Sequence, residues 1–372
     1  MKVVKFGGTS LANAENILKA KTIIDADPTR SFVVVSAPGK CAGFGRKITD
    51  LLIDTHAQLC FADTCDSCDV VFERFGTLAD DLGIDIGAEL ERVREEVHIN
   101  RCDYDFVVSR GEYLMALLFS KLLGWTFLDA AHYIVIKKSG LVDEQLTKSN
   151  FAKLDKKEKY VMGGFYGRAA DISRREERYG RGVCGGVKTF ARGGSDYTGA
   201  IAAVCLGADI YENFTDTYGV QSANPAVVKH TQNVPEMDYA TLHRLCRAGA
   251  SVIYPNCIPL LRSRAMPLKV DCTFDAGKKS TFVTAKKPNN PFFSITYETK
   301  QNINKDTVEI LCVLNKIPFA LVDLRACLKG GEVYLVEFSR SGFRLITPAV
   351  NLASVINLLH KALTAAKSTA SA

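Results

Sequence analysis

The motif KFGGTS, Lys5–Ser10, joins a lysine to two adjacent glycines directly after a short apolar run. Glycine lacks a Cβ, so its backbone can approach a phosphate closely and its N–H group can line a concave anion site. A helix that begins after such a turn adds the partial positive charge of its N-terminus. Lys5 can offset the negative charge that develops on a phosphoryl group during transfer. The motif therefore indicates either phosphate binding or an ordinary tight turn, and it matches neither the Walker nor the dinucleotide pattern.

A second glycine-rich motif, ARGGSDYTG, covers Ala191–Gly199 and opens a helical pattern. Arg192 can bind a carboxylate through two parallel hydrogen bonds. Ser195 and Asp196 are of the residue types that cap helices, so capping is the alternative to a binding role. The motif alone leaves both interpretations open.

Two further motifs carry carboxylates. NFTDTYG, Asn213–Gly219, follows a predicted strand, and open α/β sheets bind ligands at the carboxyl ends of their strands. Asp216 is suited there to a ribose, a lysine ammonium or a magnesium-bound water, or it simply initiates a turn. In SRGEYLMA, Ser109–Ala116, we expect Glu112 to begin a helix, where it either complements the helix dipole or binds an amino group.

The elements that position these motifs alternate between strand and helix. We predict strands at Val3–Phe6, Phe32–Val35, Tyr133–Ile136, Lys159–Gly163 and Ile210–Phe214. Helical spacing of apolar residues covers 14–26, 111–123 and 196–206. Continuous apolar strands separated by helices favour a mainly parallel sheet that is covered on both faces. The predicted fold class is α/β.

The chain changes composition at Ala285–Pro291, AKKPNNP, where Pro and Asn disfavour a helix or a central strand. We place a linker there, between a catalytic domain at 1–285 and a small domain at 291–372. The small domain is predicted as strand, helix, strand, strand and helix, at Phe292–Glu298, Lys305–Lys316, Phe319–Ala326, Glu332–Ser339 and Leu352–Ala366. This order predicts a small α+β domain.

The composition restricts the class of protein. The 372 residues are 47% hydrophobic and 24% charged, which is typical of a globular protein. No apolar run approaches the ~20 residues of a membrane span, and the N-terminus lacks a signal-peptide pattern. We therefore expect a cytoplasmic protein with no membrane partner. The net charge of +6 comes from dispersed Lys and Arg, which argues against a nucleic-acid partner.

Twelve cysteines include the cluster Cys60, Cys65 and Cys68. A structural zinc site needs four ligands, usually as two close pairs, and here only Cys41 or His56 could supply the fourth. We predict reduced thiols and no metal site, with zinc at this cluster as the alternative.

Together these segments resemble the aspartate kinases of the amino-acid kinase superfamily. The matching pieces, in the family's order, are VVKFGGTS, FVVVSAPGK with KITDLL, SRGEYLMA, GFYG, KTFARGGSDYTGA, GADIYENFTD and GASVIYP. The resemblance covers Met1–Val283. It implies the three-layer αβα amino-acid kinase fold with a mainly parallel sheet, followed by a small α+β ACT-like domain.

The resemblance also implies an activity. MgATP would phosphorylate the β-carboxylate of L-aspartate to 4-phospho-L-aspartate, the first step of lysine, threonine and methionine biosynthesis. Magnesium would be held mainly by the phosphates. Because the acceptor carboxylate is already ionised at neutral pH, no general base is needed. A homodimer is the implied assembly.

Roles carry over to matching positions. The ATP-contacting set would be Lys5, Phe6, Gly7, Gly8, Thr215, Asp216 and Gln221. The set around the amino acid would be Ser36, Thr49, Glu112, Arg192, Ser195 and Asp196. Among these, Lys5 and Asp196 are the predicted catalytic residues, Arg192 would bind the α-carboxylate, and Glu112 and Asp196 would face the ammonium group.

The chain departs from the family pattern in three places. Asn224, Pro225 and Ala226 replace an Asp-Pro-Arg segment, so a charged nucleotide contact is lost. An Arg-rich segment, 168–182, is longer than expected; it is a solvated loop or a basic flap whose Arg174 and Arg175 supply the missing cation. The region after the linker suffices for one ACT-like module rather than two, which argues against simple lysine inhibition. A catalytically weak regulatory or ligand-binding paralogue, or a kinase for a related amino acid, are the alternatives.

Overall fold

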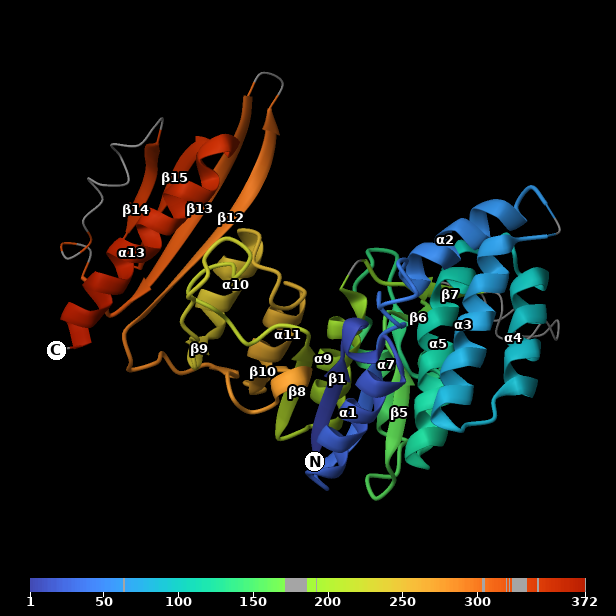
Figure 1. Ribbon diagram of the computed structural model, residues 1–372. Helices are drawn as coiled ribbons and strands as arrows, with labels where there is room; N and C mark the ends of the chain where they lie inside the picture. The colour runs from blue at the N-terminus through green and yellow to red at the C-terminus, as the bar shows by residue number, and fades with distance from the viewer. Residues whose placement is uncertain are drawn as a thin grey trace. The chain divides into compact units, whose positions relative to one another are not determined.

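The structure is a computed structural model, drawn in Figure 1, that describes residues 1–62, 64–170, 186–191, 193–302, 305–318, 320, 322, 333–339 and 341–371. Residues 171–182 of the predicted Arg-rich segment, including Arg174 and Arg175, and the predicted ligand Arg192 lie outside the described residues, whereas Arg168 and Ala169 end strand β6, Tyr166–Ala169. Two compact units divide the chain, Met1–Thr217 and Tyr218–Ala372. The predicted domains at 1–285 and 291–372 rest on composition and stay a prediction.

Parallel strands form the centre of the first unit. Their order is β3-β5-β2-β1-β8, and each neighbouring pair is parallel. Their bounds are β1 Lys2–Phe6, β2 Arg30–Val35, β3 Thr126–Leu128, β5 Tyr160–Gly163 and β8 Ile210–Thr215. The last four residues of β1 and of β2 are buried without alternation, as expected for strands covered on both faces. The α/β class predicted from the sequence is confirmed.

Helices surround these strands. Their bounds are α1 Ala14–Asp25, α2 Ile48–Leu59, α3 Asp66–Leu82, α4 Gly87–Ile99, α5 Tyr104–Leu123, α6 Ala130–Tyr133, α7 Glu144–Phe151 and α9 Gly194–Leu206, with the 3-10 turn η1 at Thr9–Leu11. Helix α5 packs on β2, β3 and β5, whereas α9 packs on β1, β2 and β8. Helices α2, α3 and α4 lie against α5 (Figure 1).

A small three-stranded sheet, β4-β6-β7, completes the first unit. Its strands are β4 Val135–Ile136, β6 Tyr166–Ala169 and β7 Val187–Thr189. The strand predicted at Tyr133–Ile136 is therefore shorter than expected, because its first residue ends α6.

The second unit contains two groups of strands. The first group, in the order β10-β11-β9, comprises β9 Glu236–Asp238, β10 Leu268–Cys272 and β11 Thr281–Thr284, with α10 Tyr239–Arg247, α11 Cys257–Ser263 and the 3-10 turn η2 Thr273–Asp275. The second group is an antiparallel sheet in the order β12-β13-β15-β14, made of β12 Phe292–Asn302, β13 Lys305–Asn315, β14 Tyr334–Ser339 and β15 Gly342–Pro348. The 3-10 turn η4 Ala349–Asn351 leads into α13 Leu352–Ser371, which buries Leu359 and Leu363 against this sheet. The predicted final helix is confirmed.

The helix predicted at Lys305–Lys316 is wrong, because these residues form β13. Val308, Ile310 and Cys312 alternate along the strand and enter the core under α13. Leu311 and Val313, between them, are buried as well. A strand buried on both faces has a continuous apolar run that resembles a buried helix in sequence. The strand predicted at Phe319–Ala326 lies almost wholly outside the described residues.

In the described part of the chain, no helix is both long enough and apolar enough to cross a membrane.

Candidate active site

The carboxyl ends of four parallel strands meet at one edge of the first unit's sheet. Gly7, Ser36 and Gly164 follow β1, β2 and β5, and Asp216 follows β8. Main-chain hydrogen bonds join these ends: Gly7 N donates to Phe214 O at 3.1 Å, and Gly164 N donates to Val35 O at 2.9 Å. The topology therefore brings the motifs that are far apart in sequence to the edge where such sheets bind ligands.

Gly8, the second glycine of KFGGTS, packs closely against the loop after β2. A Cβ on Gly8 would lie 2.7 Å from Ala37 O, and a Cβ on Gly39 would lie 2.7 Å from the Gly8 carbonyl carbon. Gly39 N donates to Gly8 O at 2.7 Å, so the loops after β1 and β2 touch along their backbones. Gly8 is therefore required for the close contact between the two loops, which is consistent with a phosphate-binding loop. Gly39 is its packing partner, which sequence analysis did not identify.

Phe6 can reach a ligand only through its main chain. Its side chain is fully buried and stacks on Phe214 with ring centroids 5.2 Å apart. Its carbonyl accepts a hydrogen bond from Ser36 N at 3.1 Å, which fixes half-buried Ser36 at the end of β2.

Lys5 and Asp196 form an ion pair at this edge. The Lys5 Nζ lies 2.7 Å from Asp196 Oδ1, and the two side chains are only 7% and 15% exposed. A Cβ on Gly7 would lie 3.4 Å from the same Nζ, so the ammonium sits beside the glycine loop. Asn213 Nδ2 donates to Asp196 Oδ1 at 3.3 Å. The two predicted catalytic residues are thus brought together.

Glu112 does not begin a helix, contrary to the prediction. Helix α5 begins eight residues earlier at Tyr104, where Asp103 accepts a hydrogen bond from Phe106 N. Glu112 is therefore in the helix interior, and dipole complementation at a first turn cannot explain it. The only Asp or Glu in that first turn is Asp105.

Burial sets the charge of Glu112. Its carboxyl group is buried, and this desolvation raises its pKa to about 8 although the Ala37 N–H opposes the shift. In the part of the chain that the structure describes, Glu112 Oε2 has no hydrogen-bond partner. A buried carboxylate oxygen without a donor fits a site that receives a cation from a ligand.

Ser195 and Asp196 lie in the first turn of α9, and neither is the N-cap. The N-cap is Gly193, whose φ of 90° lies in the left-handed region that favours glycine. The capping alternative is therefore excluded for both side chains. Ser195 is buried against Gly164, where a Cβ would lie 2.6 Å from the Ser195 Cβ.

Phe165 is a site residue that the sequence reasoning missed. Its φ of 75° is unusual for a residue with a bulky side chain, and such strain is typical of functional sites. Phe165 N donates to Thr198 Oγ1 at 3.1 Å, and Phe165 O accepts from Phe190 N at 2.8 Å. These bonds hold the loop after β5 against the start of α9. The Gly-Gly pair before Phe165 was the available signal.

The remaining predicted contacts are placed as follows. Thr49 is the half-buried second residue of α2. Thr215 Oγ1 donates to Thr217 O at 2.9 Å and shapes the turn that exposes Asp216. Gln221 belongs to the second unit, where its amide donates to Gly219 O and to Asn233 Oδ1, both at 3.2 Å.

The cysteine cluster contains buried thiols. Cys68 N donates to Cys65 Sγ at 3.2 Å, and burial raises the pKa of Cys68 to about 12. Within the residues that the structure covers, no three His, Cys, Asp or Glu side chains group as ligands of a metal ion.

Known proteins share both the sequence and the fold. The model of the amino acid kinase family matches residues 1–270. Aspartokinase 3 of Bacillus subtilis is 32% identical over 321 residues, which cover 80% of this chain and 67% of that protein. An aspartokinase of Chlamydia pneumoniae is 30% identical over 316 residues, which cover 80% of this chain and 65% of that protein. The chain thus spans about two thirds of the length of these relatives.

Solved structures agree in fold. Clostridium acetobutylicum aspartate kinase superposes with a TM-score of 0.83 at 23% identity, over 98% of this chain and 100% of that one. Aspartokinase III of E. coli superposes with a TM-score of 0.80 at 18% identity, again over 98% and 100%. With its motifs in the family's order and a matching family model, the chain belongs to the amino acid kinase family, within its aspartokinase group.

Proposed function

We propose that this protein transfers the γ-phosphoryl group of MgATP to the β-carboxylate of L-aspartate, giving 4-phospho-L-aspartate and ADP. The observation that carries the proposal is the Lys5–Asp196 ion pair beside Gly7 at the carboxyl edge of the sheet, where buried Glu112 has an oxygen without a partner among the described residues. The aspartokinase relatives support aspartate as the acceptor, and aspartokinase III of E. coli forms a complex with aspartate and ADP.

The nucleotide would bind to the loops after β1 and β8. Lys5 and the main chain of Phe6, Gly7 and Gly8 would contact the phosphates. Gly7 N already donates to Phe214 O, so Gly8 and the start of η1 are the better source of N–H donors. Thr215, Asp216 and Gln221 would hold the rest of the nucleotide. Magnesium would arrive with ATP and neutralise phosphate charge.

The amino acid would bind between the loops after β2 and β5 and the start of α9. The predicted contacts are Ser36, Thr49, Glu112, Ser195 and Asp196, with Arg192 as the clamp for the α-carboxylate. Glu112 would bind the substrate ammonium, because this cation can donate a hydrogen bond to the unpaired Glu112 Oε2. The positive charge would also offset the free-energy cost of ionising a buried carboxyl group.

Catalysis would consist of positioning and charge stabilisation. A β-carboxylate oxygen of the substrate forms the new O–P bond while the bond from the γ-phosphorus to the bridging oxygen of ADP breaks. The acceptor is already ionised, so no side chain has to remove a proton. The Lys5 ammonium has three N–H donors, of which one serves Asp196, and it can stabilise charge on the phosphoryl oxygens in the transition state.

The second unit would supply assembly and regulation. Its antiparallel sheet with one covering helix is consistent with the predicted ACT-like module, and we propose that the protein acts as a homodimer. Sedimentation velocity on the purified protein tests this directly: a species of twice the chain mass is expected, and a monomer at micromolar concentration contradicts it.

The activity is tested by trapping the acyl phosphate with hydroxylamine. Purified protein with MgATP and L-aspartate should form a hydroxamate, which should be absent without aspartate and from the Lys5→Ala variant. L-Glutamate and N-acetyl-L-glutamate serve as competing acceptors in parallel reactions. A signal with another acceptor alone would change the substrate, and silence with every acceptor would reject the proposed activity.

A further inference from the structure

Asn213 is a buried residue at the candidate site that the proposed function leaves without a role. It lies in β8 directly opposite Lys5 of β1, as its Cα partner in the parallel pair. Register partners in neighbouring strands project to the same face, so both side chains extend toward α9. Asn213 Nδ2 donates at 3.3 Å to Asp196 Oδ1, the same oxygen that pairs with Lys5 at 2.7 Å.

The other end of the Asn213 amide is not satisfied. Asn213 is fully buried, and its Oδ1 has no hydrogen-bond partner within the described part of the chain. Turning the amide around would bring Oδ1 against Asp196 Oδ1, which places two acceptors together. The contact with Asp196 therefore fixes the amide orientation and leaves the oxygen unpaired, an arrangement that costs about 1–3 kcal/mol.

Because the unpaired oxygen of Asn213 lowers the stability of the folded protein, the presence of asparagine at this position calls for a functional reason. Leucine has the same branching as asparagine and would remove the unpaired acceptor, at the cost of some overpacking by its methyl groups and of the hydrogen bond to Asp196. What leucine would lose is the N–H that restrains the Asp196 carboxylate.

We propose that Asn213 is a positioning residue for phosphoryl transfer, which holds the Asp196 carboxylate so that it keeps the Lys5 ammonium beside Gly7. This inference rests on the proposed function. Asn213 touches neither substrate nor nucleotide in this scheme; it acts through Asp196 on Lys5. Its removal should therefore lower kcat and leave the folded state intact.

The test compares Asn213→Leu with Asn213→Asp and with a matched control, Ser31→Ala. Ser31 Oγ is another buried acceptor without a partner in the described chain, but it lies near the start of β2, away from the carboxyl edge. For Asn213→Leu we expect a kcat lower by roughly 10- to 100-fold per folded molecule, a KM for MgATP within about threefold of wild type, and a protein that remains folded at the assay temperature. Ser31→Ala should keep both kcat and melting temperature.

Asn213→Asp gives a readout that a merely structural role would not change. The new carboxylate lies beside Asp196 and adds negative charge next to the phosphate site, so MgATP affinity measured by calorimetry should fall about tenfold. Asn213→Leu adds no charge and should leave this affinity unchanged.

Failure of the inference can be told apart from failure of the proposed function. If wild type forms no hydroxamate with any acceptor, the proposed function is rejected, and the inference that rests on it is rejected as well. With an active wild type, an Asn213→Leu variant that keeps its kcat, or whose kcat falls only in proportion to its folded fraction, overturns the inference and leaves the proposed function standing.

Discussion

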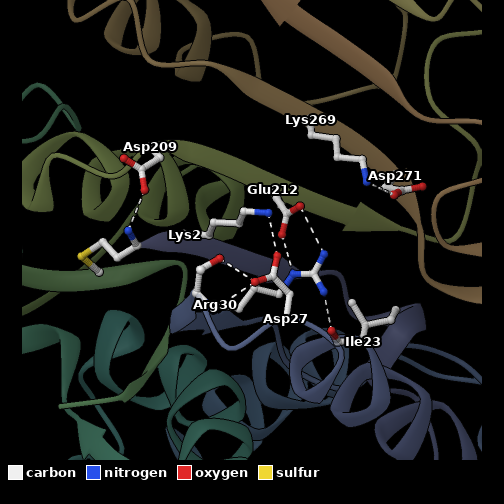
Figure 2. A network of polar contacts seen from close by, with 10 residues as sticks. Lys2, Ile23, Asp27, Arg30, Asp209, Glu212, Lys269 and Asp271 are labelled. Carbon is white, nitrogen blue, oxygen red and sulfur yellow. Dashed lines mark hydrogen bonds and ion pairs between the residues drawn. The ribbon is translucent and has the colours of Figure 1, made fainter. Parts of the chain in front are cut away.

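The two ends of the parallel sheet in the first unit differ in how completely their charged and polar groups are paired. Toward the amino ends of the strands, charged side chains of the first unit that Figure 2 draws are paired with one another. Lys2 of β1 pairs with Asp27 at 2.7 Å, and the terminal ammonium pairs with Asp209 at the same distance. The Lys2 ammonium, as hydrogen-bond donor, holds the pKa of Asp27 well below its usual range.

Arg30 shows how complete this pairing is. Its guanidinium donates to both carboxylate oxygens of Glu212, at 2.6 and 3.3 Å, and to Ile23 O (Figure 2). In the second unit, Lys269 and Asp271 form a similar pair at 2.7 Å. Every charge in these groups has a protein partner, so they serve the fold.

The carboxyl edge differs because its polar groups are incompletely paired. Of the buried carboxylate and amide oxygens in the described chain, only Glu112 Oε2 and Asn213 Oδ1 lack a partner, and both belong to this edge. Unpaired buried carboxylate and amide oxygens, more than charge itself, distinguish this edge from the structural network, whereas an unpaired hydroxyl, Ser31 Oγ, occurs near the amino edge as well.

The largest expected difference is between two lysines of the same strand. Lys5→Ala should lower kcat roughly 10³-fold, because it removes the cation that stabilises the transferred phosphoryl group. Lys2→Ala breaks a partly exposed pair and should cost about 1 kcal/mol or less in the free energy of unfolding, with kcat unchanged. Hydroxamate assays and urea denaturation measure the two effects. A loss of kcat in Lys2→Ala would remove the distinction between the edges.

Arg30→Met tests the structural edge. The Glu212 side chain is only 3% exposed, so removing its partner should lower the free energy of unfolding by about 3 kcal/mol. The double variant Arg30→Met with Glu212→Leu should recover most of that stability, since no buried charge remains unpaired. Denaturant titration measures stability, and kcat of the folded fraction should stay at the wild-type value. A stable but inactive Arg30→Met protein would contradict this assignment.

Gly164→Ala and Gly76→Ala form a matched pair. The Cβ at Gly164 would collide with Ser195, so kcat/KM for aspartate should fall roughly tenfold or more through displacement of the start of α9. Gly76 lies inside α3 with open space around it, so alanine there should stabilise the protein by about 0.5–1 kcal/mol and leave kinetics unchanged. Equal kinetics in the two variants would mean that the loop after β5 is not part of the site.

Sequence patterns predicted the local features of this molecule well. Two apolar runs that end before Gly7 and Ser36 predicted strands, and β1 and β2 end at these positions. Together with the order of the glycine motifs, they predicted an α/β fold whose motifs lie at the carboxyl edge of the sheet, as the structure has them. Such features depend on neighbours in sequence, where propensity and spacing carry the information.

Features that depend on distant contacts were not predicted. Glu112 was expected at a helix start. Its surroundings come instead from the loop after β2, whose Ala37 N–H contacts the carboxyl group, and from Gly163, where an added Cβ would lie 2.8 Å from Glu112 O. The role of Asn213 follows from its register with Lys5, which no local pattern encodes. The β13 strand was mistaken for a helix because both of its faces are buried.

The pH dependence of Glu112 follows from its raised pKa. Unfolding returns the carboxyl to its ordinary pKa of 4.5, whereas the folded value is about 8. Between these values the folded state binds one proton more than the unfolded state, so the free energy of unfolding should fall as pH rises, by up to about 1.4 kcal/mol per pH unit. Glu112→Gln should lack this slope. Urea denaturation at several pH values measures it.

The most direct test of the site is proton release on binding of L-aspartate, measured by calorimetry in buffers of different ionisation enthalpy. At pH 7 the carboxyl of Glu112 carries a proton in the free protein, and pairing with the substrate ammonium should expel it. We predict release of about one proton by wild type, an affinity for aspartate that rises with pH up to about 8, and no release by Glu112→Gln. Wild-type binding without proton release, or equal release by Glu112→Gln, would contradict the assignment of this unpaired carboxyl to the substrate.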